Sequence, residues 1–78
     1  MKFRVTTVKA IFTPDGWPVP RSVTWEGARL PIVDTGRRWR TADGVHILAL
    51  VEDGRVFELH TNGSLWRAAV VSTPPHFA

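Results

Sequence analysis

The chain has 78 residues and a mass of 8.8 kDa, which is the size of one compact domain with one modest core. Hydrophobic residues make up 44% of it and charged residues 22%, so the composition is too apolar for a disordered protein and typical of a soluble domain. The absence of cysteine excludes disulfide frameworks, thiol nucleophiles and thiolate metal sites, and the net charge of +3 favours an acidic partner.

The first twenty residues show the alternation and the turn residues of β-strands. Residues 2–9 alternate, with Phe3 and Val5 on one side and Lys2 and Arg4 on the other, as a half-buried strand requires. A turn follows at residues 13–16, where the order Thr-Pro-Asp-Gly supplies residues that preset φ or tolerate a positive φ. Two prolines within residues 17–20 forbid a central strand, so this segment is predicted to be a surface loop or an extended edge.

The dipeptide at residues 26–27, Glu-Gly, is the first of three predicted two-residue hairpin loops. It would pair Trp25 with Ala28 and Val23 with Leu30, which places these four side chains on one face. Of the three loops it has the weakest hairpin signal, because Glu is not a preferred residue of such turns.

Two stronger hairpin signals follow at Asp53-Gly54 and Asn62-Gly63. Counted as two-residue loops, the first pairs Leu50 with Phe57 and the second pairs Leu59 with Trp66. The two registers agree on one inner face, which is predicted to consist of Leu48, Leu50, Phe57, Leu59, Trp66, Ala68 and Val70.

Short strands broken by a turn roughly every 8 to 12 residues, with no sustained helical period, predict an all-β fold. We expect a single domain over residues 1–72, built as a small antiparallel barrel or strongly curled sheet, SH3-like or OB-like, of five to six strands. Residues 73–78 are predicted to form a proline-rich C-terminal tail. The longest apolar run is too short to cross a bilayer and the start of the chain lacks the apolar stretch of a signal peptide, so a cytoplasmic location is expected.

The face opposite the predicted inner face is too apolar to be fully solvated. Trp17, in the proline-rich segment, fits no strand face and either caps the mouth of the barrel or anchors a partner. The leading hypothesis is therefore a non-enzymatic interaction module that docks onto a protein partner or onto a second copy of itself as a homo-oligomer. Its interface would consist of Trp17, Ile47, Val51, Val56 and Val71.

Residues 36–40 are the densest basic stretch, with one tryptophan among three arginines. Strand alternation with Trp39 inward sends Arg38 and Arg40 outward. The outward arginines are either a solvated face, neutralised by the flanking Asp34 and Asp43, or a surface that contacts phosphates. The alternative hypothesis is thus a nucleic-acid-binding module whose contacts are Arg37, Arg38, Arg40, Arg21 and Arg29.

The three histidines, His46, His60 and His76, are scattered, and the predicted register points His46 and His60 to opposite faces of their sheet. Neither a metal site nor a nucleophile and base pair can be assembled from them. The chain also lacks a Gly-rich phosphate loop and an acyl-transfer motif. We therefore expect no enzyme activity, no catalytic or metal-binding residues and no cofactor.

Five short motifs between residues 20 and 71 resemble a known family. They are Pro20-Arg21, Trp25-Glu26-Gly27, Trp39-Arg40, Asp53-Gly54 followed by Phe57, and Trp66. In this order they resemble a small domain of unknown function that is found alone and at the C-terminus of some catalytically defective Y-family DNA-polymerase homologues. The family's final Asp is absent here, where Ser72-Thr73-Pro74 stands instead. The resemblance implies a docking or nucleic-acid-associated module and carries over no catalytic residue.

Overall fold

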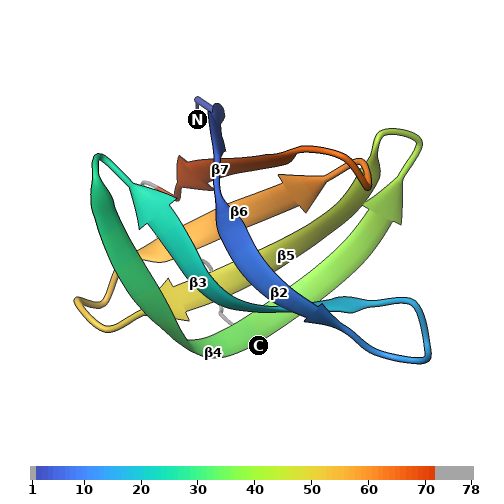
Figure 1. The fold of residues 1–78 in the computed structure, drawn as a ribbon, viewed down its shortest axis with the longest axis horizontal. Coiled ribbons are helices and arrows are strands. Elements are labelled where there is room, and N and C mark those ends of the chain that lie inside the picture. The colour runs from blue at the N-terminus through green and yellow to red at the C-terminus, as the bar shows by residue number, and fades with distance from the viewer. Residues whose placement is uncertain (1, 72–78) are drawn as a thin grey trace.

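The computed structural model describes residues 2–71, and these residues form seven strands and no helix (Figure 1). The all-β prediction is confirmed, whereas the expected count of five to six strands was wrong. The predicted tail at residues 73–78 lies outside the described residues. The strands are β1 (Arg4–Thr6), β2 (Val8–Phe12), β3 (Pro18–Trp25), β4 (Ala28–Thr41), β5 (Gly44–Val51), β6 (Val56–Thr61) and β7 (Trp66–Val70).

All seven strands belong to one antiparallel sheet with the order β1-β7-β6-β5-β4-β3-β2. Its two edge strands, β1 and β2, are separated only by Thr7, so the sheet must curl to bring its edges together. The curl places β2 and β3 over β5 and β6 in Figure 1. At the meeting point the backbone N–H of Thr24 donates to the carbonyl oxygen of Thr7 at 2.9 Å. Residues 2–9 therefore supply two strands, because the segment changes neighbours at Thr7.

The hydrophobic core fills the inside of the curl. Trp25 of β3 packs edge-on against Phe57 of β6, with ring centres 5.2 Å apart and ring planes inclined by 72°. This contact joins the two halves of the curled sheet, and edge-to-face packing is a favourable geometry for aromatic pairs. The buried core residues are Val23, Trp25, Ala49, Val51, Phe57, Leu59 and Ala68, against which Val8, Leu30, Ile32, Trp66 and Val70 pack.

The hairpin between β3 and β4 has the predicted register, with Trp25 opposite Ala28 and Val23 opposite Leu30. Its two loop residues both have a positive φ, 49° at Glu26 and 80° at Gly27. This backbone is the type I′ turn that matches the twist of two-stranded hairpins. The weakest of the three hairpin signals therefore gave a correct register.

The hairpin between β5 and β6 has one residue more in its loop than predicted. Val51 donates its N–H to the Arg55 carbonyl and accepts from the N–H of Gly54, which leaves a three-residue loop at residues 52–54. Leu50 consequently lies opposite Val56 and not Phe57. A slip of one residue moves every side chain of a strand to the other face. The prediction that Leu48 and Leu50 face the core was wrong, and the core side of β5 carries Ile47, Ala49 and Val51.

The loop between β6 and β7 has two residues more than predicted. The register of the two strands therefore differs from the prediction, but each side chain lies on the predicted face. Thr61 lies opposite Trp66, and Leu59 lies opposite Ala68. The Asn62 side chain organises the four-residue loop by accepting the N–H groups of Ser64 and Leu65, both at 2.9 Å. A shift of two residues preserves the alternation of faces. Phe57, Leu59 and Ala68 therefore lie in the core as expected.

Candidate functional site

Two arginine side chains of β4 lie over the ring of Trp17. The guanidinium carbons of Arg38 and Arg40 lie 4.4 and 4.2 Å from the centre of the Trp17 ring. Both distances are within the range of cation–π contacts. We name these three residues the Trp17 cluster. Trp17 itself is half-buried, while both arginines are exposed.

The turn at residues 13–16 fixes the position of Trp17. The Trp17 carbonyl accepts the N–H of Thr13 at 3.1 Å, and the Trp17 N–H donates to the Asp15 carboxylate at 3.0 Å. The Thr13 hydroxyl also donates to the Asp15 carboxylate. This hydroxyl, followed by the Trp17 N–H, lowers the pKa of Asp15, and the positive charges of Arg38 and Arg40 add a smaller contribution. The Asp15 carboxylate is therefore held in its charged form close to the Trp17 cluster.

Arg38 and Arg40 lie on the core side of the sheet, as Ile32 does, and the two bulges between Ile32 and Arg38 leave that side unchanged. The pairing with β5 shifts between Ile32 and Asp34 and again between Thr35 and Arg38. Each extra residue reverses the alternation of faces, so two of them restore it. As a result Arg38 lies opposite Ile47, whose side chain is buried. Both arginines remain exposed because Trp17, and not the apolar core, packs over them.

Trp39 lies on the outer face of β4, opposite His46. Its ring stacks on that of His46 with centres 5.1 Å apart and planes inclined by 6°. The guanidinium carbon of Arg37 lies 5.3 Å from the centre of the Trp39 ring. The prediction that Trp39 points inward and its neighbouring arginines outward was wrong, because it followed side-chain polarity and not the alternation that runs from Ile32.

The five predicted phosphate contacts are all exposed, but the structure does not gather them on one strand face. Arg38 and Arg40 share the Trp17 cluster, Arg37 lies against Trp39, and Arg21 and Arg29 lie on β3 and at the start of β4. Within residues 2–71 the ion pairs are Arg4 with Glu26, Arg55 with Asp53 and His46 with Glu58. None of the five arginines therefore has a carboxylate partner there, and the expected neutralisation by Asp34 and Asp43 is not observed.

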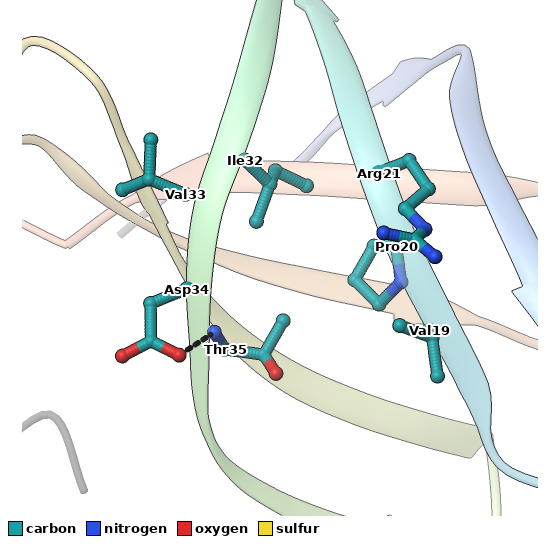
Figure 2. Close-up of a pocket in the computed structure, with 7 residues that line it drawn as sticks. All are labelled: Val19, Pro20, Arg21, Ile32, Val33, Asp34 and Thr35. Carbon is teal, nitrogen blue, oxygen red and sulfur yellow. Dashed lines mark hydrogen bonds between the residues drawn. The ribbon is translucent and has the colours of Figure 1, made fainter.

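An open cleft of about 150 Å³ lies between β3 and β4, beyond the point where their pairing ends (Figure 2). In Figure 2, Ile32 and Thr35 point from β4 toward β3, whereas Val33 and Asp34 point away from it. Arg21 stands on the opposite wall, so this predicted phosphate contact borders a cavity. The lining residues are Val19, Pro20, Arg21, Ile32, Val33, Asp34 and Thr35.

A row of aromatic and imidazole rings crosses the outer face of the sheet, and the sequence analysis missed it. His46 and His60 lie directly opposite each other, with ring centres 4.5 Å apart, so the prediction of opposite faces was wrong. The cause is the one-residue slip of β5. His46 Nδ1 lies 3.0 Å from the Glu58 carboxylate, and His46 Nε2 lies 3.0 Å from the Thr41 hydroxyl.

The donor and acceptor roles in this row depend on the tautomer of His46. In the tautomer with the proton on Nδ1, His46 donates to the Glu58 carboxylate and its Nε2 accepts the hydroxyl proton of Thr41. A hydroxyl, an imidazole and a carboxylate in series are the components of a proton relay. In the described part of the chain, however, the cleft lies on the other half of β4. We therefore assign these bonds to the positioning of the β4–β5 turn, where His60 also donates to the Asp43 carbonyl at 3.1 Å.

The predicted protein interface is largely inside the domain. Ile47 and Val51 are each 2% exposed, and Val56 is 6% exposed. Ile47 and Val51 moved to the core side with the slip of β5, and Val56 is covered on the outer face. Val71 and Trp17 are half-buried. Ile47, Val51 and Val56 are therefore not available to the apolar docking surface expected from the sequence. The large apolar side chains that are exposed are Val5, Ile11, Phe12, Val33 and Leu65.

Three further findings complete the description. Residues 2–71 contain no group of three or more histidine, aspartate or glutamate side chains that could hold a metal ion. No helix in the same residues is long and apolar enough to cross a membrane. No family model, curated protein or solved structure matches the chain.

Proposed function

We propose that the chain is a non-enzymatic binding module that contacts the phosphate groups of nucleic acid through Arg38 and Arg40. The observation that supports this most strongly is the Trp17 cluster, where two guanidinium groups lie 4.4 and 4.2 Å from one indole ring. In residues 2–71 no carboxylate forms an ion pair with either group. Neither guanidinium group is held in an ion pair, so both can contact an external anion.

The Trp17 ring prepares both arginines for that anion. A guanidinium group that stacks on a ring keeps its N–H donors free at the edge, and those donors match the oxygens of a phosphate. Stacking also restricts long side chains before binding, which lowers the entropy lost when the anion arrives. The Asp15 carboxylate close by limits the strength of the site, since it carries a negative charge near both arginines.

The same contacts argue for recognition of the backbone rather than of a base by either tryptophan. Trp17 is occupied by two guanidinium groups, and Trp39 stacks on His46. Contacts to phosphates position a protein on nucleic acid without reading its sequence. Binding through these arginines is therefore expected to be independent of sequence and sensitive to salt.

The experiment compares two double variants that each remove two positive charges. R38A/R40A empties the Trp17 cluster of its cations, and K2A/R67A removes two exposed cations from the region of β1 and β7. Affinity for a short oligonucleotide at low ionic strength should fall by roughly tenfold or more in R38A/R40A, because two charge-assisted contacts are lost. A smaller loss is expected in K2A/R67A. Equal losses in the two variants, or no binding by the wild type, would overturn the proposal.

A second candidate function, docking onto a protein partner or a second copy, is favoured by one feature of β2. This strand forms one edge of the sheet, and its Ile11 and Phe12 side chains are 51% and 63% exposed. An edge strand with exposed apolar residues is a template for pairing with another chain. Sedimentation equilibrium at micromolar concentration tests self-association. If the wild type is a dimer and F12S dissociates it, docking through β2 is favoured. A strict monomer would count against self-association through this edge.

A further inference from the structure

The cleft between β3 and β4 exists because both strands are irregular at the same place. In β3, Pro20 lies opposite Ala10 and Ser22 lies opposite Lys9, which leaves Arg21 without a partner residue in β2. In β4 the first register shift leaves Val33 without a partner residue in β5. Bulges of this kind are common beside binding sites, where they turn side chains into new directions. Here both extra residues line the cleft.

The prolines of β3 keep the cleft open. The Trp17 carbonyl points toward β2, because it accepts the N–H of Thr13. Since backbone groups alternate along a strand, those of Pro18 and Pro20 point the other way, toward β4. Proline has no N–H to donate to a neighbouring strand. The β3–β4 pairing accordingly ends at Ser22 and Pro31, and the carbonyl oxygens on this side remain available as acceptors.

The cleft adjoins the Trp17 cluster along both strands. Val19 follows Trp17 by two residues, and Thr35 precedes Arg38 by three, so at ~3.3 Å per residue the cleft and the cluster are about 7 to 10 Å apart. The volume of about 150 Å³ is several times that of one water molecule in the liquid, roughly 30 Å³. An open cleft of this size can accept one planar ring system.

We propose that the cleft receives a single unpaired nucleobase while Arg38 and Arg40 hold an adjacent phosphate. This inference rests on the proposed function and adds a preference for single strands to it. The exposed lining of the cleft is mostly polar, and the Arg21 guanidinium on its wall offers a plane on which a base can stack. Thr35, which points toward β3 in Figure 2, offers a hydroxyl that can donate to or accept from the edge of such a base.

Two oligonucleotides of the same length, one single-stranded and one duplex, separate this inference from the proposed function when both are titrated at one ionic strength. The wild type should bind the single strand about tenfold more tightly, which is within the range measured for stacking of one base. T35F should remove this preference, because Thr35 points into the cleft and the larger ring fills it. L65F is the control, because it adds the same ring to an exposed side chain that does not line the cleft.

The wild type also provides a test that does not depend on the folding of a variant. A nucleoside monophosphate should shift the amide resonances of Val19, Arg21 and Thr35, whereas inorganic phosphate should shift those of Arg38 and Arg40 only. A free nucleotide that binds as well as the single strand would identify a mononucleotide as the ligand of the same site. Weaker binding of the free nucleotide than of the single strand would identify the polymer as the ligand of the site.

The outcomes distinguish the two claims. Loss of the single-strand preference in T35F but not in L65F supports the base subsite. If the single strand and the duplex bind the wild type equally, or if T35F keeps the preference, the base subsite is wrong while phosphate binding through Arg38 and Arg40 can still hold. If neither oligonucleotide binds the wild type, both claims are overturned.

Discussion

The guanidinium group of Arg40 stacks on Trp17, with 4.2 Å between its central carbon and the centre of the indole ring. The two residues lie on different segments, one at the end of a tight turn and the other near the end of β4. Arg38 reaches the same ring from the same face of β4. Loop and strand are thereby joined through two cations.

Removal of the Trp17 ring should weaken anion binding without abolishing the fold. W17A loses two cation–π contacts, each worth roughly 0.5–1 kcal/mol at an exposed site, so the free energy of unfolding should fall by about 1–2 kcal/mol. Oligonucleotide affinity should fall several-fold, because Arg38 and Arg40 remain charged but lose their support. W17F keeps an aromatic face, so its free energy of unfolding and its oligonucleotide affinity should lie between those of W17A and the wild type. Chemical unfolding and binding titrations measure the two effects, and unchanged affinity in W17A would argue against a supporting role.

The register of β5 can be tested by two alanine substitutions. I47A removes a side chain that is 2% exposed, so it should lower the free energy of unfolding by about 2–5 kcal/mol. L50A changes a half-buried residue on the outer face and should cost less. Urea unfolding of both variants decides between the registers. A larger loss for L50A than for I47A would support the two-residue loop at Asp53-Gly54, which the structure contradicts.

Gly44 should be the glycine that tolerates alanine least. Its φ is 135°, and a Cβ atom placed on it would lie 2.1 Å from the Thr61 carbonyl oxygen. G44A therefore combines a strained backbone with a clash against β6, and a loss of more than about 3 kcal/mol in unfolding free energy is expected. G54A is the control, since it also has a positive φ but no atom within 4 Å of the added Cβ. Equal losses would show that β6 does not approach Gly44 so closely.

Acid should loosen the turn that holds Trp17. The pKa of Asp15 is lowered below its ordinary value of 3.8, chiefly by the Thr13 hydroxyl and then by the Trp17 N–H. A carboxylate with a lowered pKa stabilises the folded state above its ordinary pKa, and this stabilisation is lost as the pH falls through the lowered value. The Asp15 titration followed by NMR should thus have its midpoint below 3.8. D15N should remove this part of the acid dependence, and a midpoint above 3.8 would contradict the hydrogen bonds described.

Much of the fold follows from the sequence, because turn dipeptides and alternation predict strands and hairpins. The limit is loop length. Asp53-Gly54 forms a three-residue loop and not a two-residue one, and this single residue exchanged the faces of Leu50 and Val51. The sequence carries no independent signal for that choice, since both faces of β5 are apolar.

The candidate site was predicted in its residues but not in its arrangement. Arg38 and Arg40 were identified from their density of charge, and Trp17 was set apart by its proline-rich surroundings. Their contact depends on the face of β4 that carries both arginines and on the turn at residues 13–16, which together bring distant segments to one place. The pairing of His46 with His60 was not predicted for a different reason, because it depends on the register of β5.

The central claim is that Arg38 and Arg40 neutralise phosphates, and the salt dependence of binding tests it most directly. For a single-stranded oligonucleotide, each neutralised phosphate contributes about 0.7 to the slope of log affinity against log salt. R38A/R40A should therefore have a slope shallower than that of the wild type by roughly 1 to 1.5, while K2A/R67A should keep most of the wild-type slope. An R38A/R40A slope equal to that of the wild type would contradict the account.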